Sequence, residues 1–142
     1  MRLTAALLLI VFAACGPSPD AQRAGQLRYE GHTLEEWWLL RRDANDETAA
    51  EARVAIRMMG AAAVPFLADK AASHDLGNNL GGSTALEDQC PSALPAMEAA
   101  RGDYPSPALE VAIRRVRAEA AARVRTGLCE AGGKPVRPEP RQ

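Results

Sequence analysis

Histidine is the side chain best suited to proton transfer or zinc binding near neutral pH, and this chain has two, His32 and His74. They lie far apart in the sequence, both in expected loops. No His-x-x-x-His or His-Glu-x-x-His motif is present to hold zinc, and no nucleophile motif accompanies either residue. We therefore expect surface histidines and no metal or cofactor. An enzyme or enzyme subunit that uses His32 or His74 with nearby carboxylates is the alternative.

Thiol chemistry rests on three cysteines, Cys15, Cys90 and Cys129. Cys15 ends an apolar N-terminal segment, which leaves Cys90 and Cys129 as an even pair. In an exported protein such a pair predicts a disulfide, and closing this loop would restrict the unfolded chain. Two free thiols are the alternative. A redox role has less support because the chain has no Cys-x-x-Cys.

Residues 1–15 are typical of an export signal. Arg2 supplies the positive start, and the apolar run 5–14 would extend about 15 Å as a helix, half of a hydrocarbon core of roughly 30 Å. The end of this run, Phe12-Ala13-Ala14-Cys15, resembles a bacterial lipobox. This resemblance implies a signal peptide over 1–14, lipidation of Cys15, and a lipid-anchored domain in the bacterial cell envelope, outside the cytoplasm. An ordinary secretory signal cut near Ala14 is the alternative.

Composition favours one helical domain without a nucleic-acid partner. The chain has 142 residues, of which 47% are hydrophobic and 25% charged, an ordinary globular balance. Aromatic residues make up 4%, and sparse Val, Ile and Thr disfavour strands. A formal net charge of −1 gives no bulk attraction to nucleic acid. Turn-forming residues predict a flexible tether within 15–28 and a disordered tail over 132–142, with the folded domain at 29–131.

Apolar residues at helical spacing predict four or five helices in that domain. Thr33 and Glu36 can form a capping box for a helix over 34–42. Asn45 or Asp46 caps the next helix, over 46–59, and Gly60 ends it. The helix over 64–72 should fold back on it as a hairpin.

In the second half of the chain, the sequence signals for helices are weak at first and strong near the end. The glycine-rich stretch 73–83 predicts a loop. Helices are expected over 92–100 and over 107–126, and the latter begins with a Ser-Pro pair and ends at Gly127. The core is expected to contain Ile56, Met59, Leu67, Leu109, Ile113 and Val116.

The run 46–67 joins two helices through small residues, a glycine and then x-x-Val-Pro-x-Leu, and it resembles the junction between HEAT-type helical repeats. The Tyr-x-Gly-x-Thr-Leu-x-x-Trp spelling over 29–37 is similar to the lead-in before HEAT-like repeats in exported bacterial proteins. Val-Ala-Ile-Arg at 54–57 recurs at 111–114. The resemblance implies an all-α, armadillo-type array, and a non-catalytic protein-interaction or scaffolding role. The disulfide would staple such a short array.

Arginines on the helices over 48–59 and 107–126 predict a partner surface, because the second helices of HEAT-like pairs line one face. Guanidinium groups hold carboxylates in bidentate pairs, which favours an acidic envelope protein. The alternative is a solvated face that only keeps the protein soluble. Trp37 and Trp38 point about 100° apart, so we expect one at the rim as a contact residue. The residues assigned to partner binding are Arg53, Arg57, Arg114, Arg117, Arg125 and Trp38.

Overall fold

A computed structural model of the chain describes residues 16–139. The fold is mostly helical, with 65% of the described residues in helices, as the sequence predicts. The elements are α1 (Pro19–Gly25), β1 (Arg28–Tyr29), β2 (His32–Thr33), α2 (Leu34–Leu40), α3 (Asp46–Met59), the 3-10 turn η1 (Gly60–Ala63), α4 (Val64–Ala71), α5 (Leu76–Glu87), the 3-10 turn η2 (Pro91–Ala93), α6 (Leu94–Ala99) and α7 (Pro107–Arg125). Among residues 16–139, no helix has the length and apolar character to cross a membrane.

Side-chain caps place the helix boundaries where the sequence predicts them. Thr33 and Glu36 form both hydrogen bonds of a capping box at the start of α2. The Asn45 side chain accepts from the first-turn amides of α3, and Ser106 accepts from Leu109 N at the start of α7. Gly60 ends α3 with φ at 56°, a conformation that glycine adopts without a Cβ clash.

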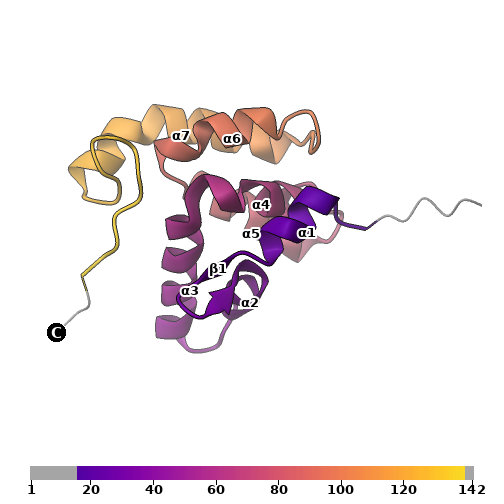
Figure 1. Cartoon of the computed structure of the whole chain (residues 1–142). Coiled ribbons are helices and arrows are strands. Elements are labelled where there is room, and N and C mark those ends of the chain that lie inside the picture. The colour runs from indigo at the N-terminus through magenta and orange to yellow at the C-terminus, as the bar shows by residue number, and fades with distance from the viewer. Residues whose placement is uncertain (1–15, 140–142) are drawn as a thin grey trace, which may run out of the picture.

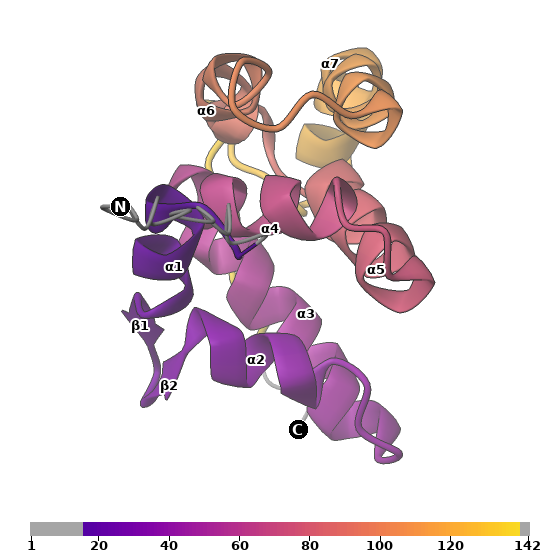
Figure 2. The same cartoon turned by 90° about the vertical axis from the view of Figure 1, so that its right-hand side faces the viewer.

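Figures 1 and 2 show the helices in three tiers, with α2 beside α3 at the base, α4, α5 and α1 in the middle, and α6 and α7 across the top. The sequence prediction that α4 folds back on α3 is wrong. Instead, α4 turns away at η1 and packs against α5 and α1 (Figure 2). The α2–α3 and α6–α7 pairs pack as expected, while membership of the HEAT-like family stays a prediction.

The segment expected as a flexible tether contains helix α1. Ser18 caps it by accepting from Ala21 N, and Pro19 occupies its first turn. Ala21 and Ala24 are buried where α1 packs against α4, and the Ser18 hydroxyl is hydrogen-bonded to the hydroxyl of Tyr104. Only 16–18 precede the helix among the described residues. The signal peptide and Cys15 lie outside them.

The segment expected as a loop over 73–83 forms most of helix α5. Asp75 caps it by accepting from Asn78 N at 2.7 Å. Gly82 is buried against α4, where a Cβ would overlap the amide nitrogen of Ala71 and lie 2.8 Å from its Cα. The glycines of this segment therefore allow helices to pack closely, and do not mark a loop.

The core joins all three tiers. Of the expected core residues, Ile56, Leu67, Leu109, Ile113 and Val116 are buried, and Met59 is partly buried against them. Both tryptophans are also buried, with 4% exposure each, so the expectation of one indole at the rim is wrong. Trp38 packs edge-on against Phe66 of α4, and the Trp37 indole nitrogen donates to Tyr29 O.

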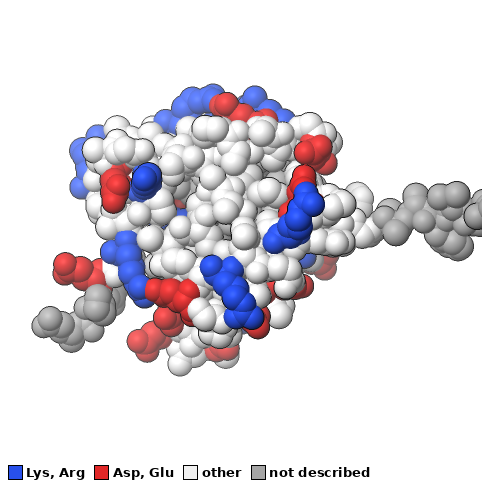
Figure 3. Space-filling view, in the orientation of Figure 1, with Lys and Arg blue, Asp and Glu red and all other residues white. Residues whose placement is uncertain are grey.

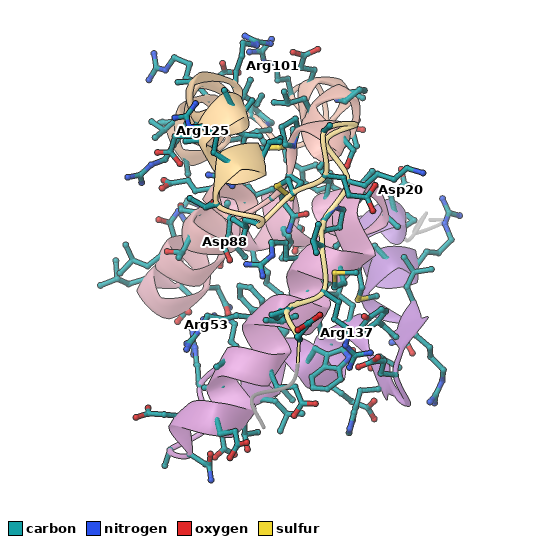
Figure 4. All side chains as sticks on the ribbon, turned by 90° about the vertical axis from the view of Figure 1, so that its left-hand side faces the viewer. Asp20, Arg53, Asp88, Arg101, Arg125 and Arg137 are labelled. Carbon is teal, nitrogen blue, oxygen red and sulfur yellow. A yellow bond between two sulfur atoms is a disulfide. The ribbon has the colours of Figure 1, made fainter. Side chains whose placement is uncertain are left out.

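The predicted disulfide between Cys90 and Cys129 is confirmed, with Cα atoms 5.9 Å apart. It holds the segment after α7 to the start of η2. The following residues were expected to be disordered from 132, but Val136 N donates to Leu128 O and Arg137 pairs with Glu30. The chain therefore runs as an ordered strap past α3 up to residue 139 (Figure 4).

Candidate functional site

A pocket of about 420 Å³ opens between the C-terminal end of α2, the middle of α3 and the length of α5. Its volume falls within the range of ligand sites, roughly 300–1,000 Å³. Five of the twelve lining residues are apolar or glycine, and four of the other seven are arginines. The lining residues are Arg41, Arg42, Arg53, Ile56, Arg57, Gly77, Leu80, Gly81, Thr84, Ala85, Asp88 and Gln89.

Contacts on two sides hold the Arg41 side chain in this wall. Its guanidinium carbon lies 3.6 Å from the centroid of the Trp38 ring, in a cation–π contact. Its other side lies against α5, where a Cβ on Gly81 would overlap Nη2. Nε and Nη2 are buried and have no hydrogen-bond partner within residues 16–139. Burial of the guanidinium, together with the charge of Arg42, lowers the pKa of Arg41 to about 10.

Arg57 extends into the pocket from α3, and only some of its guanidinium nitrogens have hydrogen-bond partners. The residue is 8% exposed, and its Nη1 donates to Asp88 Oδ2 at 3.4 Å. Its Nε is buried without a partner in the described part of the chain, as is Oε1 of the fully buried Gln89. Asp88 is the only carboxylate among the lining residues. One carboxylate therefore faces several guanidinium groups.

Arg42 and Arg53 extend the positive wall toward solvent. Both side chains are exposed, and neither forms an ion pair within residues 16–139. A Cβ on Gly77 would lie 2.7 Å from Arg42 Nη2, so this arginine also lies close to α5. Figure 4 shows Arg53 of α3 and Asp88 at the end of α5 on the same side of the molecule, with Arg125 farther up on α7.

Ion pairing distinguishes this pocket from the rest of the surface. Arginines elsewhere mostly pair with a carboxylate; those pairs involve Arg23, Arg101, Arg115, Arg117, Arg123 and Arg137. Figure 3 likewise shows basic and acidic groups interleaved around a broad uncharged area. In the part of the chain that the structure describes, three of the four pocket arginines lack such a partner. The pocket therefore concentrates uncompensated positive charge in a protein whose net charge is −1.

The residues assigned to partner binding do not form one strip. Arg53 and Arg57 meet at the pocket, whereas Arg114, Arg117 and Arg125 are exposed on α7, which lies across the opposite tier from α3 (Figure 1). Trp38 is no contact residue, because its ring is buried beneath the Arg41 guanidinium.

One further arginine of α7, Arg123, has a structural role. Arg123 is 7% exposed, and its Nη1 donates to Gln89 O at 2.6 Å. Its Nη2 donates to Glu87 O and to Glu119 Oε2. Hydrogen bonds from Arg115 and Arg123 hold the pKa of Glu119 below its usual value. This arginine therefore caps the end of α5 and joins it to α7.

Neither histidine reaches a carboxylate in an enclosed site. His32 lies with its Nδ1 3.7 Å from Glu36 Oε2 on an exposed surface, edge-on to Trp37. His74 lines a hollow of about 600 Å³ that also borders Asp75 and Asp103. No hydrogen bond or ion pair joins His74 to a carboxylate within residues 16–139, and that range contains no group of three or more potential metal-ligating residues.

Sequence reasoning missed Arg41 and Arg42 because they fall in the last turn of the helix expected over 34–42 and belong to no motif. The signal that could have found them is the Gly77/Gly81 spacing, which leaves one face of a helix bare for a neighbouring side chain. Compared with known protein families, curated proteins and solved structures, the chain matches none. The geometry of the pocket is therefore the main indication of function.

Proposed function

We propose that this chain is a non-catalytic binding module of the bacterial cell envelope, anchored to a membrane through lipidated Cys15. The observation that carries the binding role is the pocket between α2, α3 and α5, where four arginines face one carboxylate. Guanidinium groups remain protonated at neutral pH, including Arg41 with its pKa of about 10. They hold anions by charge and directed hydrogen bonds, but do not accept a proton.

The envelope location is supported by two features of the chain. One is the lipobox-like ending at Cys15. The other is the disulfide between Cys90 and Cys129, since such bonds persist mainly in oxidising compartments. Replacing Cys15 with Ser should move the protein from the membrane fraction to the soluble envelope fraction. Unchanged membrane fractionation would contradict the lipid anchor.

The binding role is tested with the purified full chain and an envelope extract. We expect the extract to raise the unfolding temperature in a saturable way, and to keep its small-molecule composition through prolonged incubation. Multiple-turnover loss of a component that His32→Ala or His74→Ala abolishes would favour the enzyme alternative. No stabilisation by any extract fraction would contradict the binding module itself.

A further inference from the structure

We propose that the pocket between α2, α3 and α5 binds a small organic anion, with a carboxylate or phosphate held by Arg41 and Arg57 and an apolar body lying against Ile56, Leu80 and Ala85. This inference rests on the proposed binding function and names the class of ligand that the same site takes.

The charge of the ligand follows from the arginines. Arg57 is nine-tenths buried, and its single ion pair, to Asp88, leaves Nε without a partner in residues 16–139. Arg41 has two buried nitrogens, Nε and Nη2, that likewise lack a hydrogen-bond partner within residues 16–139. A buried, unpaired donor is destabilising, and a charged one more so. An oxyanion at this wall supplies the missing countercharge, and its oxygens can accept from Arg41 Nη1 and Arg57 Nη2, which are neither buried nor hydrogen-bonded within residues 16–139.

The orientation of Arg41 is set before any ligand arrives. Its guanidinium is held between the Trp38 ring at 3.6 Å and the bare backbone at Gly81. Nη1 is the guanidinium nitrogen that is not buried, and because the stacked group is already held in one orientation, little conformational freedom is lost on binding. This arrangement favours a directed carboxylate or phosphate contact over diffuse attraction of salt ions.

The size and the remaining wall determine the body of the ligand. A volume of about 420 Å³ holds roughly fourteen waters at about 30 Å³ each, so it exceeds an inorganic phosphate ion several-fold. Ile56 is buried at the base of the pocket, Ala85 is partly buried, and Leu80 is 58% exposed at its rim. These side chains offer no hydrogen bonds, so they suit an apolar ligand body of about ten to fifteen non-hydrogen atoms.

Isothermal titration calorimetry on the full chain tests this ligand class with four probes. Phenyl phosphate and 4-phenylbutyrate carry an anion on an apolar body, 4-phenylbutanamide keeps the body without the charge, and inorganic phosphate keeps the charge without the body. We expect saturable binding of at least one of the first two and at least tenfold weaker binding of the last two. Which of the first two binds more tightly distinguishes phosphate from carboxylate ligands.

Three variants locate the binding. Arg41→Gln should weaken the preferred organic anion at least tenfold, and Arg53→Gln should weaken it several-fold. Arg125→Gln is the matched control, since this exposed arginine lies on α7 away from the pocket, and it should leave affinity unchanged. Circular dichroism verifies folding of each variant, and the exposed Arg53 keeps the test decisive if Arg41→Gln does not fold.

The inference would be overturned if wild type and both pocket variants bound the organic anion with equal affinity, or if the amide bound as tightly as the acid. It would also be overturned if inorganic phosphate bound as tightly as the organic anions, or if no small anion bound at millimolar concentration. A glutamate-rich peptide that binds through Arg41 when the small anions do not would also overturn it. That result would leave the binding module standing. Failure of every probe and of the envelope extract would remove both proposals.

Discussion

Replacement of two adjacent glycines of α5 by alanine should affect the free energy of unfolding to different extents. Exchanging glycine for alanine inside a helix stabilises it by about 0.5–1 kcal/mol. At Gly81 the new Cβ meets the guanidinium of Arg41, at Nη2, Cζ and Nη1, and this end of a flexible side chain can rotate away. The loss is then the Trp38 contact, about 0.5–2 kcal/mol, so Gly81→Ala should change the free energy of unfolding by about 1 kcal/mol or less.

At Gly82 the new Cβ meets the backbone of Ala71, and neither helix can yield locally. The α4 and α5 backbones must separate, and overpacking of this kind typically costs about 1–3 kcal/mol. That cost exceeds the gain in helix propensity. Gly82→Ala should therefore lower the free energy of unfolding by about 1–2 kcal/mol, or the unfolding temperature by about 4–8 °C.

Urea unfolding followed by circular dichroism at 222 nm measures both variants against wild type. The pair controls for helix propensity, because both substitutions are the same and lie next to each other in α5. Titration with the preferred organic anion adds a second measurement, in which only Gly81→Ala should weaken binding strongly. Equal or higher stability of Gly82→Ala would refute the close α4–α5 packing as the reason for glycine at this position.

Four further predictions concern single features. Cys129→Ala should cost about 4 kcal/mol of stability in denaturant, as chain-entropy estimates give for a loop of 39 residues; an unchanged urea midpoint would contradict this. Arg123→Met should lower stability by about 2–3 kcal/mol in the same assay, because it removes the donors to the carbonyls of Glu87, at the end of α5, and of Gln89 just after it. Anion affinity measured by calorimetry should stay constant up to about pH 9 and fall as pH rises through about 10, since Arg41 loses its charge there; a flat profile would refute its role. Charge reversal of Arg114 and Arg117 together should leave small-anion binding unchanged but reduce crosslinking to an acidic envelope protein, and unchanged crosslinking of a folded variant would refute the α7 partner surface.

Local signals in the sequence predicted most of the helices correctly. The Thr33–Glu36 capping box, the Asn45 and Ser106 caps and the stop at Gly60 all depend on residues within one turn of each other, so a linear pattern contains them. The disulfide was predictable because only one even pair remained. Stripes at helical spacing likewise identified core residues in α3, α4 and α7.

Helices α1 and α5 were missed because tertiary packing, and not local preference, explains their composition. In α5 the glycines that suggest a loop allow close approach to Ala71 and to two arginine side chains. In α1 only two alanines face the core, so the apolar stripe is too narrow to detect. The pocket was missed for a related reason: Arg41 follows α2, Arg57 lies in α3 and Asp88 follows α5, and only the fold brings these residues together.

The position of the pocket links ligand binding to the stability of the fold. It lies where the base tier, α2 and α3, meets the end of α5 in the middle tier, and the Arg57–Asp88 pair is a direct polar link across that seam. Without a bound anion, the partly desolvated guanidinium groups of Arg41 and Arg57 have only the Asp88 carboxylate as countercharge there, which opposes the packing of the two tiers. A bound anion reverses this effect by neutralising the wall, and a ligand at a hundred times its dissociation constant adds about 2.7 kcal/mol of stability. The arginines that destabilise the unliganded protein would thus make its free energy of unfolding depend on the ligand. Such dependence is expected of a receptor and not of a purely structural helix pair.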